Sequence, residues 1–381
     1  MKKVLFLLAV LILFSCKQEK KEKLSPPVSN ESIKIKYAKG FSIEKSSSGL
    51  TLIKLTSPWP NAETTFTYAL VPKEIAPFTT LNKEAYDAII TVPVERVIVT
   101  STTHIPALEA LGALDKLVGF PNTSFISSKK ARRLIDVGRI KELGNNEALN
   151  TEMIITLNPD VIVGFGIDNQ NKTYKTLQKS NISVVYNGEW VEETPLGKAE
   201  WIKFFAPFFD AEIKADSIFN SIEKAYDEAK TLAQKATKRP TVLSGGLYKD
   251  VWYAAGGKSW VAQFLQDAHC DYIYKDAAAH GSLSLSLESV LDKAHKADFW
   301  LNPSLHVSYK ELINANEHYK QFDAFKNKKV YTNVSVKGET GGLLFYELAP
   351  QRPDLVLKDL IHIFHPELLP EYQNVFFKPL E

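Results

Sequence analysis

The chain has 381 residues, of which 45% are hydrophobic and 11% aromatic, and its formal net charge is +2. This composition is typical of a globular protein with an extensive core, large enough here for two lobes. So small a net charge gives no electrostatic basis for binding nucleic acid, and we expect no nucleic-acid partner. Beyond the N-terminus no segment is apolar for the ~18 residues of a membrane span, so no transmembrane helix is predicted.

The N-terminus has the pattern of a lipoprotein signal. Lys2 and Lys3 precede an unbroken apolar run of 11 residues, 4–14. This run is too short for the ~30 Å core of a bilayer and fits the apolar region of a secretory signal. It ends in Leu13-Phe14-Ser15-Cys16, which resembles a lipobox, where the cysteine is lipidated and the peptide is cut before it. We therefore predict a signal peptide over 1–15 and lipid on Cys16. The alternative is an ordinary secretory signal followed by a chance cysteine.

Residues 16–32 are predicted to be the lipidated cysteine and a flexible linker, because the segment is polar and charged with almost no apolar residue. Fully stretched, it reaches at most about 55 Å. We expect an extracytoplasmic protein anchored to a membrane, with the periplasmic face favoured. Lys17-Gln18 lacks the acidic residue that keeps many lipoproteins in the inner membrane, so the choice of membrane stays open. With Cys16 lipidated, Cys270 has no disulfide partner and is expected to be a small core residue.

Residues 33–94 predict a β-rich extension. Ile33, Ile35 and Tyr37 alternate with lysines, which is the period of a half-buried strand. A second run, 65–71, is rich in Thr and aromatic residues and closes at Pro72. We expect a small antiparallel sheet that packs on the next domain, and we assign it no function.

Two α/β lobes follow, at 95–200 and 240–367, with a bridging helix at 201–239 and a C-terminal tail at 368–381. In both lobes short apolar runs of strand length alternate with helical patterns, which predicts parallel sheets covered by helices. The strands are expected at 97–100, 117–120, 161–164, 183–186, 241–244, 251–254, 298–301 and 330–332. The helices are expected at 105–114, 151–157, 172–179, 260–268, 287–294, 315–325 and 355–364. We thus predict an α/β fold of two Rossmann-like lobes joined by one long helix, with a cleft at the carboxyl ends of the strands.

An ordered series of motifs over roughly 95–366 resembles the periplasmic binding proteins of ABC importers for iron–siderophores, haem and cobalamin. No single piece is diagnostic, and the order carries the resemblance. The pieces lie at 96–104, 107–119, 137–138, 149–163, 256–260, 285–291 and 352–367. The resemblance implies a helix-braced, two-lobed binding protein that captures a metal chelate and delivers it to a permease and its ATPase. It implies no enzymatic activity and no cofactor of the protein's own, and we expect a monomer.

The resemblance also implies a role for Glu152 and Glu288, one in each lobe, as contacts to arginines of the permease. From the residues alone, each is an acidic side chain in the first turn of a helix, capped by Asn150 or Thr151 in one lobe and by Ser284 or Ser286 in the other. The dipole of the helix favours such a side chain without any partner.

Aromatic side chains near strand ends are the candidate ligand contacts, because iron complexes and tetrapyrroles are large and flat. The candidates are Phe120, Phe165, Trp190, Trp252 and Tyr253. Arg139 is a candidate partner for an anionic chelate, and His104 a candidate at the mouth of the cleft. For each aromatic residue a core position is the alternative. No metal site is predicted from the scattered histidines.

The cargo stays open among an iron–siderophore, which we favour, haem and a corrinoid. Two other interpretations of the cleft also stay open. One is a lipoprotein hydrolase, although the sequence shows no Gly-x-Ser-x-Gly and no His-Glu-x-x-His motif. The other is a scavenger that works without its own permease.

Overall fold

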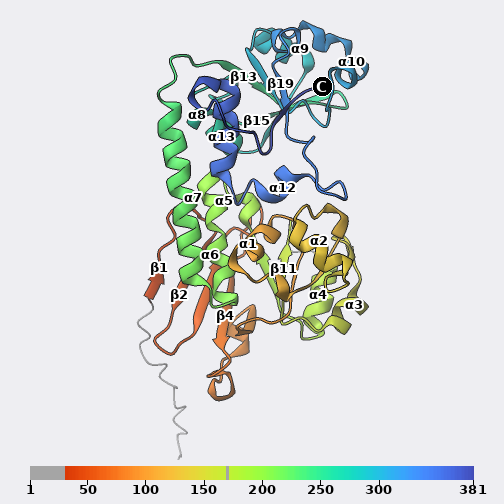
Figure 1. The fold of residues 1–381 in the computed structure, drawn as a ribbon. Helices are drawn as coiled ribbons and strands as arrows, with labels where there is room; N and C mark the ends of the chain where they lie inside the picture. Colours follow the sequence, from red (N-terminus) through yellow and green to blue (C-terminus); the bar gives the residue numbers. More distant parts are fainter. Residues whose placement is uncertain (1–30, 169–170) are drawn as a thin grey trace, which may run out of the picture.

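The computed structural model describes residues 31–168 and 171–381, so the predicted signal peptide, Cys16 and nearly all of the predicted linker lie outside the described residues. Two lobes lie one above the other, and α7 (Glu212–Ala233) runs along one side of the molecule between them (Figure 1). This arrangement is the helix-braced α/β fold expected from the sequence. Within the described residues, no helix is both long enough and apolar enough to span a bilayer.

The N-terminal extension is a five-stranded sheet in the order β1-β2-β3-β4-β5, antiparallel except for the parallel pair β4–β5. Its strands are β1 (Glu31–Ile33), β2 (Phe41–Lys45), β3 (Thr51–Leu55), β4 (Phe66–Pro72) and β5 (Ala88–Val92). The alternation from Ile33 to Tyr37 does not form one strand, because β1 ends at Ile33. The N–H groups that would extend the strand are bound by a carboxylate instead.

That carboxylate belongs to Glu200, whose residue is 0% exposed. Its oxygens accept the backbone N–H groups of Lys36, Tyr37 and Ala38 at 2.9, 2.6 and 3.0 Å. Lys203 Nζ lies 3.1 Å from it and provides the compensating charge. A buried carboxylate needs such partners, so the chain at 36–38 is held against the lower lobe.

The lower lobe holds a parallel sheet in the order β12-β11-β6-β7-β8. The strands are β6 (Val97–Val99), β7 (Leu117–Phe120), β8 (Lys141–Glu142), β11 (Val161–Phe165) and β12 (Val184–Asn187). Its helices are α1 (His104–Leu111), α2 (Lys129–Asp136), α3 (Thr151–Leu157) and α4 (Lys172–Lys179). A short pair, β9 (Gly144–Asn145) and β10 (Ala148–Leu149), lies apart from this sheet.

The bridging region is less continuous than one helix over 201–239. It consists of α5 (Pro195–Glu200), α6 (Ile202–Phe205), a 3-10 turn at Ala206–Phe208, and α7. Pro207 cannot donate an N–H to a helix, which explains the break before α7. The long brace is therefore α7 alone, and α13 (Pro353–Phe364) packs along it.

The upper lobe holds a sheet in the order β16-β13-β18-β19-β20, with only the last pair antiparallel, and a small antiparallel sheet β14-β15-β17. Its strands are β13 (Thr241–Ser244), β14 (Gly246–Tyr248), β15 (Val251–Ala255), β16 (Asp271–Tyr272), β17 (Ser282–Leu285), β18 (Phe299–Leu301), β19 (Val330–Thr332) and β20 (Lys378–Pro379). Its helices, besides α13, are α8 (Trp260–Asp267), α9 (Leu287–Ala294), α10 (Tyr309–Ala315), α11 (Asp323–Lys326) and α12 (Leu344–Leu348).

Two expectations for the upper lobe are corrected. The helix expected over 315–325 is broken, because Asn316 is extended and its side chain caps the next 3-10 turn by accepting His318 N–H at 3.0 Å. The last residues are not a free tail. Asp359 accepts the backbone N–H groups of Val375, Phe376 and Phe377, and β20 closes the edge of the sheet.

Glu200 should therefore be the main attachment of the extension. Glu200→Ala leaves three partly buried N–H groups and Lys203 without this partner, so we expect the free energy of unfolding to fall by about 3 kcal/mol. Urea unfolding measures it. Glu228→Ala, which removes an exposed glutamate of α7, is the control and should change stability by less than about 0.5 kcal/mol. Equal effects of the two variants would contradict the assignment.

Candidate functional site

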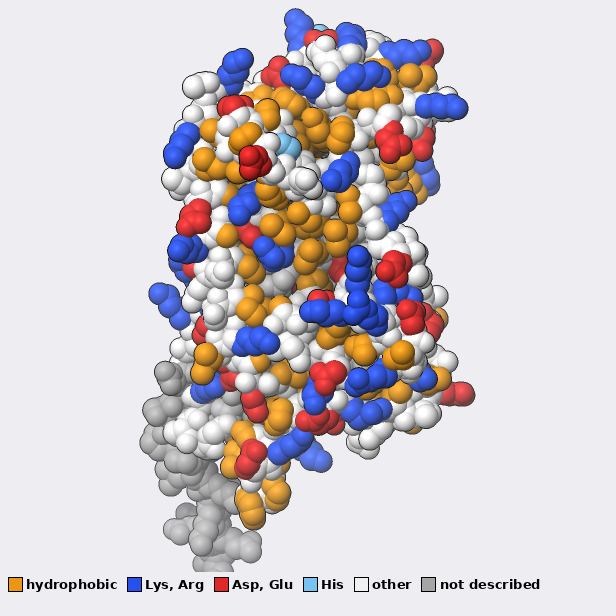
Figure 2. All heavy atoms as spheres, viewed as in Figure 1, with side chains coloured by type: hydrophobic (Ala, Val, Ile, Leu, Met, Phe, Trp, Pro, Cys, Tyr) orange, Lys and Arg blue, Asp and Glu red, His pale blue; other side chains and the backbone are white. Residues whose placement is uncertain are grey.

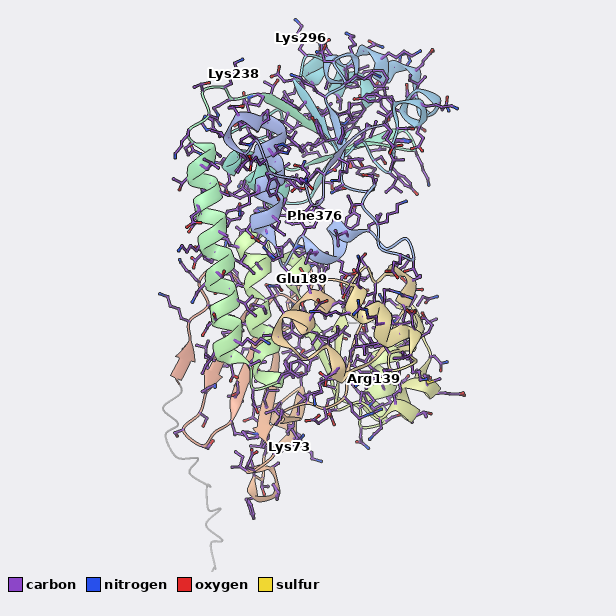
Figure 3. All side chains as sticks on the ribbon, viewed as in Figure 1. Lys73, Arg139, Glu189, Lys238, Lys296 and Phe376 are labelled. Carbon is purple, nitrogen blue, oxygen red and sulfur yellow. The ribbon has the colours of Figure 1, made fainter. Side chains whose placement is uncertain are left out.

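The carboxyl ends of β6, β11 and β12 lie side by side at one edge of the lower sheet, because these strands are parallel neighbours, and Glu189, just after β12, lies near the junction of the lobes (Figure 3). Thr100, just after β6, joins this edge because its Oγ1 accepts the Phe165 N–H at 2.8 Å. Its carbonyl accepts the Asn146 side-chain N–H at 3.0 Å. Ligands of parallel α/β sheets bind at such an edge.

An aromatic pair stands at this edge. The rings of Phe165 and Trp190 are 5.5 Å apart at 53°. Trp190 lies in a 3-10 turn after β12, and Lys198 Nζ holds that turn by donating to the carbonyls of Glu189 and Trp190 at 3.0 and 2.9 Å. Glu189 of this turn is labelled near the junction of the lobes (Figure 3). Lys198 is buried, and burial lowers the pKa of its ammonium group. The hydrogen bonds of Lys198 therefore fix the turn that carries Trp190.

Polar atoms without a partner mark the same edge in both lobes. The buried Asn187 side chain interacts with His104, whereas among the described residues no hydrogen bond reaches Asn146 Oδ1 or Trp190 Nε1 in the lower lobe. The upper lobe has Tyr274 OH and Asn302 Oδ1 in the same condition, each one or two residues after a strand. Buried polar groups are normally satisfied, so these atoms are places where a ligand or water would bind.

A hollow of about 810 Å³ lies between the lobes. Its walls come from α1, from the start of α2 and from α12, which lies between the two lobes in Figure 1. Lys129, Lys130 and Arg133 line the lower side and Arg352 the upper side. Lys and Arg side chains gather on the lower lobe just below the junction (Figure 2). Lys130 pairs with Glu109 at 3.1 Å and Arg352 with Asp354 at 2.8 Å, so attraction of an anionic molecule to this side of the junction would fall mainly to Lys129 and Arg133.

Glu347 of α12 joins the two lobes inside this hollow. Its carboxylate accepts the backbone N–H groups of Ser127 and of Ser128, the latter at 2.8 Å, just before α2. Nearby, Thr340 donates to the Ser124 carbonyl at 2.7 Å. Burial raises the pKa of Glu347 to about 7, against the opposite effect of the two N–H groups. Glu109, which pairs with Lys130 at 3.1 Å, also raises this pKa.

Of the predicted ligand contacts, the structure brings Phe165 and Trp190 together. Phe120, Trp252 and His104 lie in the cores of the lobes, which corrects the expectation that they face the cleft. Trp252 is 0% exposed and stacks on Trp300, with ring centres 5.3 Å apart. The ring of His104 packs 5.3 Å from Phe205, and burial lowers its pKa to about 3, so it carries no charge.

Arg139 and Tyr253 also differ from the expectation. Arg139 donates to the carbonyl of Asp115, which precedes β7, so it lies at the amino edge of the lower sheet, opposite the strand ends. Figure 3 places Arg139 on the part of the lower lobe away from the upper lobe. Tyr253 on β15 is 42% exposed between two buried neighbours. Its role in binding stays a prediction.

Glu152 and Glu288 are both exposed in the first turns of α3 and α9, one in each lobe. Asn150 and Ser286 are the caps, accepting N–H groups of Met153 and Ser289 at 2.9 and 3.2 Å. Backbone and Ser286 hydrogen bonds lower the pKa of Glu288. Their position suits contact with another protein, and that role stays a prediction. Within the described part of the chain, no group of three acidic, His or Cys side chains could hold a metal.

The fold and this edge are those of a binding protein, and comparison with known proteins gives its family. The periplasmic binding protein family matches residues 97–335, so the chain belongs to that family and the resemblance is confirmed. The extension before residue 97 lies outside the match.

Similar proteins come from both archaea and bacteria. An uncharacterized lipoprotein of Methanocaldococcus jannaschii is 28% identical over 299 residues, which cover 76% of this chain and 69% of that protein. A possible iron-binding, periplasmic solute-binding protein of Staphylococcus epidermidis has a similar fold, with a TM-score of 0.57, 21% identity, and 72% and 99% of the two chains covered. The haem-binding protein HutB of Vibrio cholerae has a TM-score of 0.53 and 19% identity, with 69% of this chain and 99% of HutB covered. Helicobacter pylori CeuE, solved with Ni(II), has a TM-score of 0.54 and 21% identity, with 74% of this chain and 88% of CeuE covered.

Sequence reasoning missed the polar part of this edge. Asn187 is the last residue of β12, and Asn302 directly follows β18. A search that extended each predicted strand by one residue would have found both. Lys198 and Glu347 gave no such signal, because their partners depend on the tertiary fold. Glu347 is 220 residues from Ser127 in the chain.

The raised pKa of Glu347 predicts a pH dependence of stability. The pKa is near 4.5 when unfolded and about 7 when folded, so between these values the folded chain holds the extra proton. Stability from this group therefore falls as pH rises through that window, by about 2 kcal/mol between pH 5 and 8. Urea unfolding at both pH values should show that loss in the parent chain but not in Glu347→Gln. Parallel pH profiles of the two proteins would contradict it.

Proposed function

We propose that this protein is the substrate-binding lipoprotein of an ABC importer, which captures a metal chelate between its lobes. The observation that carries the proposal is the aromatic pair of Phe165 and Trp190 at the strand ends of a chain that belongs to the periplasmic binding protein family. Flat, apolar faces with nearby unpartnered polar atoms suit a ligand that is large, planar and polar at its rim.

Iron–siderophore is the cargo we favour, with haem and a corrinoid next. Proteins of the same fold include one described as possibly iron-binding, one that binds haem and one solved with nickel(II). The basic side chains beside the junction support an anionic chelate, because Lys129, Lys130 and Arg133 come from one short helix segment and line the same hollow as Arg352.

We infer that the chain works outside the cytoplasm, tethered by lipid on Cys16. The lipobox-like sequence supports this tether, and so do lipoproteins among the relatives. Delivery to a permease would use Glu152 and Glu288. Two exposed carboxylates contribute little affinity, at most about 1 kcal/mol each, but they can set the register of both lobes on a partner.

Trp190→Ala should weaken chelate binding at least about 10-fold, because it removes a large aromatic contact. Calorimetric titration of haemin, cobinamide and several ferric siderophores measures the affinity. Arg139→Ala, at the opposite edge of the sheet, is the matched control and should bind as the parent chain does. If none of these compounds binds the parent chain, the cargo claim is wrong. If Trp190→Ala binds normally, the site is misplaced.

Glu152→Ala combined with Glu288→Ala should abolish uptake and leave ligand affinity unchanged, since both side chains are exposed and neither lines the hollow between the lobes. Uptake of the labelled chelate by cells carrying the cognate permease is the measurement. Glu63→Ala with Glu228→Ala, two other exposed glutamates, is the control. Loss of ligand affinity in the first pair, or normal uptake, would remove the docking role.

A further inference from the structure

Two large apolar side chains are almost fully exposed to solvent. In the described part of the chain, Ile213 is 89% and Phe78 88% exposed, and Leu305 follows at 71%. Phe78 ends the short 3-10 turn Ala76–Phe78, in the loop between β4 and β5. This loop belongs to the extension, which the family match does not include.

Both side chains lie at the end of the molecule where the described chain begins. Glu31 of β1 pairs with Lys45, and Lys45 Nζ lies 2.6 Å from Glu212, next to Ile213. The turn after Lys45 reaches the β4–β5 loop, since a Cβ on Gly49 would lie 3.5 Å from Ile75 Cδ1. The loop forms the lowest part of the described chain, with Lys73 at its start (Figures 1 and 3). Figure 2 shows hydrophobic side chains at this tip.

We propose that the loop at 73–87, led by Phe78, rests in the interfacial layer of the lipid bilayer that holds the lipid on Cys16. The inference rests on the proposed anchoring. Only 14 residues separate Cys16 from Glu31, so the start of β1 lies at most about 50 Å from the lipid. The tether therefore attaches at the end of the molecule that carries Phe78 and allows this end to face the bilayer.

The chemistry of the loop fits a bilayer interface. Aromatic side chains favour this layer, where the ring leaves water without entering the hydrocarbon core. Lys73 and Lys83 are outnumbered by Glu74, Glu84 and Asp87, so the loop has a net charge of −1 and its contact does not depend on anionic lipids. One phenylalanine would not hold the protein by itself. The lipid tether raises the local concentration of bilayer around the loop, so that a weak contact suffices to orient the lobes.

The test uses the full-length chain, processed in cells and reconstituted in phosphatidylcholine–phosphatidylglycerol vesicles without permease. An environment-sensitive fluorophore is attached through Thr80→Cys, an exposed position of the loop that leaves Phe78 in place, and through Leu305→Cys in the control. Cys270 is 2% exposed and burial raises the pKa of its thiol, so it will not react. In vesicles we expect the emission of the label at 80 to shift to the blue and to be quenched by doxyl lipids, while the label at 305 stays as in water.

The outcomes distinguish the anchoring by lipid on Cys16 from the contact of the loop with the bilayer. Intact mass and flotation report on the lipid at Cys16. Absence of the lipid overturns the anchoring, and with it this inference. A lipidated, floating chain whose label at 80 stays in water overturns the inference alone. Shielding of the label at 80 only when the permease is added, or only in detergent at high protein concentration, also overturns it, because the loop then contacts a protein.

Discussion

Buried carboxylates that accept backbone N–H groups from distant segments are the interaction on which the structure depends. Glu200 binds the chain at 36–38 and attaches the extension to the lower lobe. Glu347 binds the N–H groups of Ser127 and Ser128 and joins the lobes. Asp359 binds the chain at 375–377 and closes the upper sheet. Each carboxylate loses its hydration on burial. It stabilises the fold only while its hydrogen bonds to the distant segment are intact, and it destabilises the fold when they are lost.

These contacts explain why the cleft keeps its shape. The lobes meet along α7 and α13 on one side and through α12 on the other. Because α13 packs along α7 and α12 contacts α1, the lobes are held by several contacts, and we expect ligand capture to require little closure. The aromatic pair is fixed in the same way, because buried Lys198 holds the turn of Trp190. A preorganised cleft loses less conformational entropy when a ligand binds.

The sequence predicted the elements well where apolar runs decide them. The helix at 151–157 and the strand at 330–332 have the bounds expected, because period and capping residues are local signals. The site was predicted less well. A position after a strand does not tell which face the side chain takes, so Trp252 and His104 were placed in the cleft although they are buried. Glu200 and Glu347 gave no signal at all, since their partners lie more than 100 residues away.

The central claim is that two lobes, held in one arrangement, form a ready-made binding cleft. The direct measurement is the distance between spin labels at Ile155→Cys in the lower lobe and Leu305→Cys in the upper lobe, both exposed. Pulsed electron resonance is recorded without ligand and with saturating chelate. We predict one narrow distance distribution that hardly changes on binding. A broad or two-peaked distribution without ligand, which collapses to a shorter distance with it, would contradict the account.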